Sequence, residues 1–242
     1  MSYIFREHIK QSLAVIAFLI TLTACTSESY DAGDGPNSYL TADLVLLYTS
    51  QDKSVRSALL DDGTTLQFSN PFAQDWLTRP DSVYRALLYY DKTVAASDAA
   101  ASNPTATSIV RARSVRPVSV LRPVEAEDME TLRTDPVGFE SLWMSKNKSY
   151  INLSLLLKSG KAEADDALHA LGIVSHGTTT DADRRRTLHL TLYHDQGGVP
   201  AYYTVQQYVS IPTLLLEEAD TVELTLNTYN GKKVVKVAVS NL

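Results

Sequence analysis

Cysteine is almost absent from the sequence: Cys25 is the only one in 242 residues. A lone cysteine cannot form an intramolecular disulfide, so a disulfide-stapled fold is excluded and the single thiol needs its own explanation. Positive charge is also scarce, because 22 Lys and Arg residues stand against 28 Asp and Glu residues and give a net charge of −6. This balance argues against a general nucleic-acid binder, which needs clustered Lys and Arg. We therefore expect no nucleic-acid partner.

The usual catalytic signatures are missing as well. The sequence holds no G-x-S-x-G nucleophile elbow and no P-loop. The run Gly33-Asp34-Gly35 has no strand before it, so it is not a dinucleotide-binding fingerprint. A Ser-His-Asp triad follows no fixed chain order, and a carboxylate pair is defined by a distance, so the sequence leaves these two sites open. The prediction is a protein that is not an enzyme, with no catalytic residues and no cofactor.

The N-terminal hydrophobic run is short. It covers residues 13–22 and follows Arg6 and Lys10, and ten residues cannot cross a bilayer core of about 30 Å. The next residues, Leu-Thr-Ala-Cys at 22–25, resemble the lipobox of bacterial lipoproteins. We predict a lipoprotein signal peptide at 1–24 and lipidation at Cys25, which explains the lone thiol. An ordinary signal peptide and a short signal anchor are the alternatives.

The residues after the cysteine bear on location. Thr26 follows Cys25 where inner-membrane lipoproteins of some Gram-negative bacteria carry Asp, so we expect a lipid-anchored protein of the outer membrane. Residues 25–39 are small, polar and acidic and predict a flexible tether between the lipid and the first domain.

From residue 40 onward, short β-type runs alternate with turn signals, and no long helical pattern appears. Asp61-Asp62-Gly63 is a hairpin signal, because glycine tolerates the positive φ of such a turn. The Ala/Ser-rich residues 94–108 predict an exposed loop between strands. Six strands within residues 40–122 predict a small β-barrel. They are expected at 42–49, 54–60, 64–69, 83–91, 108–115 and 118–121.

The second half predicts a connector followed by a β-sandwich. Pro123 can begin a helix and the acidic residues after it suit the helix dipole, so a helical connector is expected at 123–136. Residues 137–242 predict an antiparallel sandwich of six or seven strands. Ile151, Leu153, Leu155 and Leu157 share one face, as do Leu188, Leu190 and Leu192. Asn230-Gly231 is the strongest hairpin signal in the chain.

Several segments, in their order along the chain, resemble a known family. They are DDGTTL at 61–66, Asp135-Pro136, Trp143, HALGIV at 169–174, LTLYHDQGG at 190–198, AYYTV at 201–205 and YVSIP at 208–212. Together with the lipobox they resemble the NigD-like lipoproteins of Bacteroidota. The resemblance implies an OB-like domain followed by a β-sandwich, which agrees with the strand pattern. It implies no catalytic residue.

Metal binding and ligand binding have separate candidates. His189 and His194 differ by an odd number of positions, so they face opposite sides of a strand, and we expect no metal site. The possible ligand-binding residues are Arg111, Arg113, Trp76, Tyr202 and Tyr203. The two arginines share one side of a strand and could face an anionic or glycan ligand, or could be solvated and paired with acids. Trp76 could be a core anchor, and adjacent tyrosines would place one ring inward and one outward.

The leading functional hypothesis is a non-enzymatic outer-membrane lipoprotein that binds an envelope protein or glycan. One alternative is an accessory or immunity-type subunit of an envelope assembly. The other is a glycan-active hydrolase with a carboxylate pair that the sequence does not signal.

Overall fold

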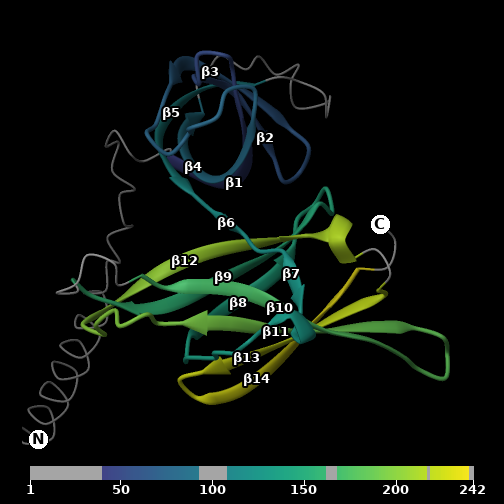
Figure 1. Cartoon of the computed structure of the whole chain (residues 1–242). Coiled ribbons are helices and arrows are strands. Elements are labelled where there is room, and N and C mark those ends of the chain that lie inside the picture. The colour runs from purple at the N-terminus through teal and green to yellow at the C-terminus, as the bar shows by residue number, and fades with distance from the viewer. Residues whose placement is uncertain (1–39, 93–107, 162–167, 217–218, 240–242) are drawn as a thin grey trace, which may run out of the picture. The chain divides into compact units, whose positions relative to one another are not determined.

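The computed structural model describes residues 40–92, 108–161, 168–216 and 219–239. The predicted signal peptide, Cys25 and the tether lie outside these residues, as does nearly all of the predicted loop at 94–108. The described residues are mainly β (Figure 1), which confirms the predicted class. Among them, no helix has the length and apolar character needed to cross a membrane.

The first five strands form a closed barrel in the order β1-β2-β3-β5-β4. They are β1 (Leu40–Thr49), β2 (Val55–Leu60), β3 (Thr65–Phe72), β4 (Val83–Lys92) and β5 (Ser108–Pro117). The β3–β5 pair is parallel and the other pairs are antiparallel. This arrangement confirms the predicted OB-like barrel. The sixth expected strand is not part of it, because β6 (Ser119–Val120) pairs with a strand of the second domain.

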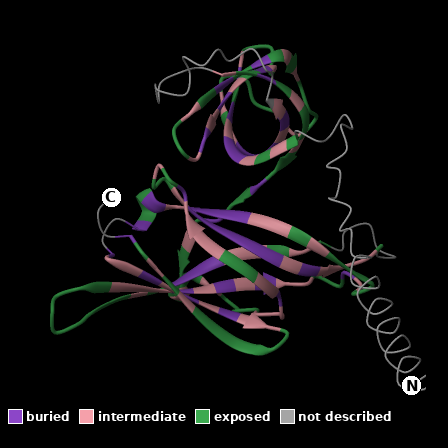
Figure 2. Ribbon diagram, turned by 180° about the vertical axis from the view of Figure 1, so that it is seen from behind, coloured by how far each residue is buried: buried purple, intermediate pink, exposed green. Residues whose placement is uncertain are grey.

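Alternation along the strands builds the barrel core. Val45, Leu47, Ala58 and Leu88 are fully buried, whereas the adjacent Leu46, Ser57 and Leu59 are only partly buried. Figure 2 shows the same alternation of buried and exposed positions along the ribbon. The core also takes in Tyr90, whose hydroxyl donates to Oδ2 of Asp43 at 2.9 Å. Burying each large apolar side chain contributes roughly 1.5–3 kcal/mol, so this core stabilises the barrel.

Two packed sheets form the second domain, which confirms the predicted sandwich. One sheet has the order β14-β13-β11-β10-β7 and the other the order β6-β12-β9-β8. The main strands are β8 (Gly138–Met144), β9 (Tyr150–Ser159), β10 (Ala170–Thr180), β11 (Arg186–Asp195), β12 (Tyr203–Pro212), β13 (Thr221–Thr228) and β14 (Gly231–Ala238). Four strand pairs of the sandwich are antiparallel, as predicted. The pairs β11–β13, β12–β6 and β10–β7 (Pro123–Glu125) are parallel.

The expected connector helix forms only one turn. Residues Pro123–Glu125 are strand β7, paired with β10, and a 3-10 turn, η3, follows at Ala126–Asp128. No side chain caps this turn, and a helix this short gains too little packing to persist. The segment therefore takes its backbone hydrogen bonds from the sheet. A second 3-10 turn, η4, covers Thr213–Leu216.

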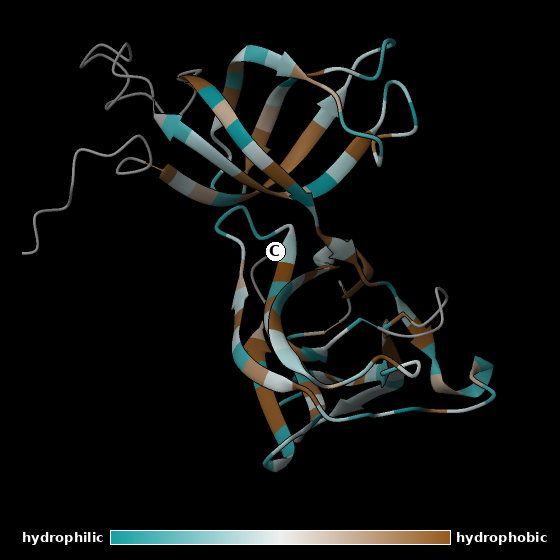
Figure 3. Ribbon diagram, turned by 90° about the vertical axis from the view of Figure 1, so that its left-hand side faces the viewer, coloured by the Kyte–Doolittle hydropathy of each residue, from teal (hydrophilic) through white to brown (hydrophobic). Residues whose placement is uncertain are grey.

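The sandwich core lies where the sequence pattern places it. Ile151, Leu153, Leu155 and Leu157 are buried on one face of β9, at 0–3% exposure. Figure 3 shows hydrophobic and hydrophilic residues alternating along the strands. The core includes Leu190 and Leu192 of β11, and His194 ends the same face with no exposed surface.

Candidate functional site

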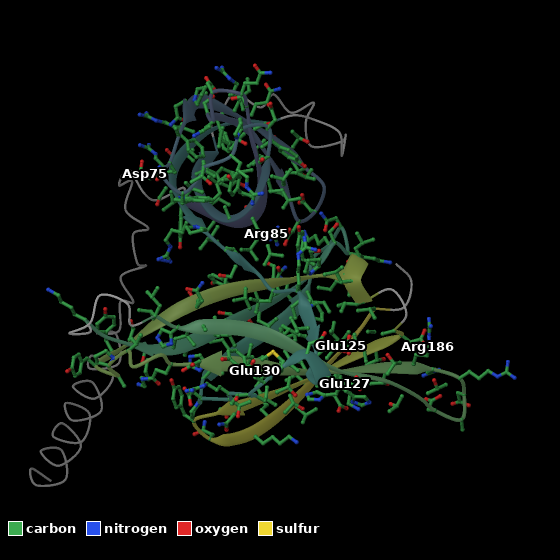
Figure 4. The ribbon with its side chains drawn as sticks, in the orientation of Figure 1. Asp75, Arg85, Glu125, Glu127, Glu130 and Arg186 are labelled. Atoms are coloured by element: carbon green, nitrogen blue, oxygen red, sulfur yellow. The ribbon has the colours of Figure 1, made fainter. Side chains whose placement is uncertain are left out.

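A buried arginine joins the barrel to the sandwich. Arg85 lies on β4, and its side chain is 1% exposed. Its Nη1 and Nη2 donate to the two carboxylate oxygens of Asp61 at 2.6 and 2.7 Å, which makes the ion pair bidentate. Nη2 also donates to Oδ1 of Asn152 on β9 at 3.0 Å, and Nε donates to Oγ of Ser210 on β12 at 3.1 Å. One barrel side chain, labelled in Figure 4, thus bonds to two strands of the sandwich.

The partners of Arg85 also bond to one another. Nδ2 of Asn152 donates to Oδ2 of Asp61 at 3.0 Å, and the Ser210 hydroxyl donates to Oδ1 of Asn152 at 2.7 Å. The Tyr150 ring lies 4.3 Å from Cζ of Arg85 and adds a cation–π contact. Buried charges persist only when they are paired and hydrogen-bonded, and this network meets both conditions. It therefore fixes the barrel on the outer face of the four-stranded sheet.

A cleft of about 430 Å³ lies beside this network. The barrel contributes residues of β1, of β4 and of the turn between β2 and β3, and the sandwich contributes residues of β8, β9 and β12. The lining side chains that can recognise a ligand are aromatic or charged: Tyr89, Trp143, Tyr208, Asp43, Asp62 and Glu140. Such a concave site between two domains is a common place for ligand binding.

The aromatic wall of the cleft rests on buried aliphatic residues. The rings of Trp143 and Tyr208 meet edge to face, with centroids 6.3 Å apart and planes at 85°. Together with Tyr89 they pack against Leu44, Leu87 and Val118. Edge-to-face packing holds each ring in one orientation, so the cleft has a preformed apolar wall.

The carboxylates of the cleft are held by hydrogen bonds. Oε2 of Glu140 accepts from the Ser154 hydroxyl at 2.6 Å and from the Gln206 amide at 2.5 Å, and these bonds lower the pKa of Glu140. The backbone N–H of Thr64 donates to Oδ1 of Asp62 at 2.9 Å and lowers the pKa of Asp62. Both groups are therefore ionised at neutral pH.

The residues that the sequence suggested as ligand contacts lie outside this cleft. Arg111 and Arg113 are exposed on β5, and Arg113 forms an ion pair with Asp91 of the neighbouring β4. Trp76 packs edge to face on Tyr84, with ring centroids 5.8 Å apart, and lies against the barrel core. Arg113 thus has an acidic partner and Trp76 has a packing role.

Tyr202 and Tyr203 differ from expectation in another way. Both rings point to solvent, at 79% and 55% exposure, although adjacent strand residues should face opposite sides. The reason is that β12 begins only at Tyr203, so Tyr202 lies before the regular strand. The pair Tyr89 and Tyr90 does follow the rule, because Tyr90 is buried in the barrel and Tyr89 lines the cleft.

The histidines use their ring nitrogens for hydrogen bonds within the sandwich. His176 bonds to the Thr191 hydroxyl at 2.9 Å, and His189 bonds to Glu223 at 3.2 Å. Nδ1 of His169 lies 3.0 Å from Nε2 of His194. Across the part of the chain that the structure describes, no three or more His, Cys, Asp or Glu side chains are placed to hold a metal ion.

Two of the cleft residues that sequence reasoning did not place in a binding site lie on β8. This strand carries Glu140 and Trp143, but a bulge shifts the register between Phe139 and Ser141 and breaks the period of two. A signal was present on β9, where polar Asn152 and Ser154 alternate with the core residues. Both are buried, and Asn152 bonds to Arg85 and Asp61 of the barrel, so the polar side of this strand marks the junction.

Comparisons with known proteins agree with this architecture. Residues 120–239 match the family of NigD-like C-terminal beta sandwich domains. A solved NigD-like immunity protein from Bacteroides caccae is 23% identical, with a TM-score of 0.59 over 81% of this chain and 91% of that one. No curated protein matches the sequence.

Two further solved structures share the fold at lower identity. A candidate lipoprotein from Bacteroides fragilis is 14% identical, with a TM-score of 0.57 over 83% of this chain and 98% of that one. A candidate toxin-related protein from Parabacteroides distasonis is 19% identical, with a TM-score of 0.52 over 82% of this chain and 92% of that one. The arrangement of barrel and sandwich is thus shared with these solved proteins of Bacteroides and Parabacteroides.

Proposed function

The chain belongs to the NigD-like family, and from this premise we propose that it is a non-enzymatic lipoprotein that binds a protein or glycan partner in the cell envelope. One observation carries the proposal: the cleft between barrel and sandwich has a preformed aromatic wall and fixed, ionised carboxylates. Rigid aromatic side chains beside oriented polar groups are typical of binding surfaces. The buried Arg85 network keeps the two sides of the cleft in place.

The charge state of the carboxylates supports binding over glycan hydrolysis. A hydrolase of this kind needs one carboxyl whose pKa is raised, so that it can act as a general acid at neutral pH. In the cleft, hydrogen bonds lower the pKa of both Glu140 and Asp62. Neither group is poised to donate a proton.

We further propose that lipid at Cys25 anchors the chain to the outer membrane. The lipobox-like sequence at 22–25 supports the anchor, and Thr26 supports the outer membrane. The shared fold of the Bacteroides fragilis candidate lipoprotein is consistent with this location. A Cys25→Ala variant should move from the membrane fraction to the soluble fraction, and full retention in the membrane would contradict the lipidation site.

An accessory or immunity-type role is the second candidate. It is favoured by the shared fold with a NigD-like immunity protein and a candidate toxin-related protein. In that role the partner would be a protein, and the same cleft would bind it.

Site-specific crosslinking in living cells tests the proposal. A photo-crosslinking amino acid replaces Lys146, which is exposed at the cleft, in the full-length chain. The control position is Arg56, which is exposed on β2 and does not line the cleft. Purified full-length chain is screened against a glycan panel in parallel.

The expected result is a discrete protein adduct from position 146 and not from 56, or binding of a glycan class. Either signal should disappear in Trp143→Ala and persist in Trp76→Phe, provided that circular dichroism shows both variants folded. Absence of both signals, or signals that Trp143→Ala leaves intact, would overturn the cleft as the binding site.

A further inference from the structure

The walls of the cleft carry an excess of negative charge. Four carboxylates line it, and one of them, Asp61, is neutralised by the buried guanidinium of Arg85. The other three are Asp43, Asp62 and Glu140, and Lys146 is the only basic side chain among the described residues that line the cleft. An anionic ligand such as a phosphate or an acidic peptide would therefore be repelled.

Hydrogen bonds hold each of these three carboxylates, although Asp62 and Glu140 are exposed. Oδ2 of Asp43 accepts from the buried Tyr90 hydroxyl at 2.9 Å, and the backbone of Thr64 holds Oδ1 of Asp62 at 2.9 Å. Glu140 uses only Oε2 for its bonds to Ser154 and Gln206. Among the described residues, Oδ1 of Asp43 and Oε1 of Glu140 therefore keep their accepting capacity for a ligand.

The aromatic wall of the cleft also favours a cationic ligand. The faces of Trp and Tyr rings attract cations through their quadrupole, and Trp is the strongest of the aromatic side chains in this respect. Trp143 and Tyr208 stand on the same cleft as Glu140, which lies on β8 three residues before Trp143. Aromatic faces with nearby carboxylates bind planar or compact cations.

We propose that the cleft takes a cationic side chain, an arginine or lysine, presented by a protein partner. The proposal rests on the proposed function, because it names the chemical group that the same cleft binds. A volume of about 430 Å³ fits one or two long side chains, and the charge of the walls complements a guanidinium or ammonium group. Carboxylate acceptors and aromatic faces both match the planar fork of arginine.

Two tripeptides that differ only in charge test this directly. Triarginine and tricitrulline have nearly the same shape, but citrulline is neutral. We expect triarginine to quench the fluorescence of the full-length chain in the Trp76→Phe background, where Trp143 is the only tryptophan. Tricitrulline should bind at least tenfold more weakly than triarginine. Added salt should weaken the binding of triarginine. Equal binding of the two peptides, or no binding of triarginine, would overturn the proposal.

Charge-neutral variants provide the matched control. The double variant Glu140→Gln/Asp62→Asn removes two charges from the cleft. It should bind triarginine at least tenfold more weakly than the wild type. Glu223→Gln removes a carboxylate from the outer face of the other sheet, where Lys236 and His189 surround it, and should leave binding unchanged. Equal loss in both variants would mean that triarginine responds only to net charge, and the proposal would fall.

The crosslinking experiment separates this proposal from the proposed function. If the adduct at position 146 persists in the Glu140→Gln/Asp62→Asn variant and triarginine does not bind, the cleft binds a partner by other chemistry. A neutral oligosaccharide that binds independently of these charges would lead to the same conclusion. If both the adduct and triarginine binding are absent, the proposed function fails together with the inference.

Discussion

Arg85 of the barrel and Asn152 of the sandwich meet at a junction closed to solvent, with Nη2 of Arg85 3.0 Å from Oδ1 of Asn152. The same amide donates from Nδ2 to Asp61, so Asn152 bonds to both members of the barrel's ion pair. The sandwich thereby supplies a donor and an acceptor that solvent would otherwise provide. The pair is satisfied only when the two domains are in contact, which couples their stability.

The first prediction concerns Arg85→Met. The variant keeps most of the side-chain volume but leaves the Asp61 carboxylate and the Asn152 amide without their main partner. Breaking a buried ion pair from one side costs about 3–5 kcal/mol, so the free energy of unfolding should fall by that amount. Urea denaturation followed by circular dichroism measures it. Arg56→Met is the control, because the Arg56 side chain is 66% exposed, and it should have little effect.

The second prediction concerns the core of the sandwich. Leu155 is fully buried on β9, so Leu155→Ala opens a cavity and should cost about 2–5 kcal/mol of unfolding free energy. Leu214 in η4 is 73% exposed, and Leu214→Ala should change stability by no more than about 0.5 kcal/mol. Comparable losses in the two variants would contradict the placement of β9.

Much of the fold follows from the period of two along the strands. Ile151, Leu153 and Leu155 alternate with polar residues, so a half-buried strand and its inner face can be predicted locally. The pattern does not show what covers the other face of β9, where Asn152 is fully buried. The partner that buries Asn152 is Arg85, 67 positions earlier in the chain, and no local pattern encodes a contact at that distance.

The candidate site was less predictable than the fold. Its aromatic wall combines Tyr89 of the barrel with Trp143 and Tyr208 of the sandwich, and only packing brings these rings together. The structure of the connector was also not predictable from the local sequence. Helix signals around Pro123 are overridden by backbone pairing of β7 with β10. Sheet pairing depends on which strand edges are available, and that is a property of the assembled domain.

The third prediction uses two adjacent glycines. Gly197 and Gly198 both have positive φ, of 59° and 77°, so alanine is strained at either position, at about 1–2 kcal/mol. A Cβ on Gly197 would lie 2.1 Å from the carbonyl oxygen of Leu168, whereas a Cβ on Gly198 meets nothing within 4 Å. Gly197→Ala should therefore cost more than Gly198→Ala, by an excess on the order of 1–3 kcal/mol. Thermal unfolding of the two variants decides it, and equal melting temperatures would contradict the close approach.

The last prediction concerns the stacked rings of His169 and His194. Nδ1 of His194 lies 2.9 Å from the carbonyl oxygen of Asp135, and a carbonyl only accepts, so His194 carries its proton on Nδ1. Its Nε2 then accepts from Nδ1 of His169, 3.0 Å away. Nε2 of His169 is buried without a hydrogen-bond partner among the described residues.

Burial, and secondarily His194, lower the pKa of His169 below its ordinary value. An unfolded histidine takes up a proton near pH 6.5, whereas the folded one resists. His169 therefore makes its full contribution to the free energy of unfolding above about pH 6.5. This contribution is lost as the pH falls through the lowered pKa. The charged side chains near the histidine pair have partners of their own. Arg133 pairs with Asp195 at 3.3 Å, and the carboxylate of Asp135 accepts from the backbone of Gln196.

Urea unfolding between pH 7.5 and 5.5 measures this dependence. His169→Asn keeps a donor near the Nδ1 position but cannot take up a proton, so its stability should fall less on acidification than that of the wild type. His176→Asn removes an exposed histidine bonded to Thr191 and should leave the pH dependence unchanged. If the His169→Asn profile matches the wild type, the hydrogen-bonded histidine pair does not set the acid sensitivity of the sandwich.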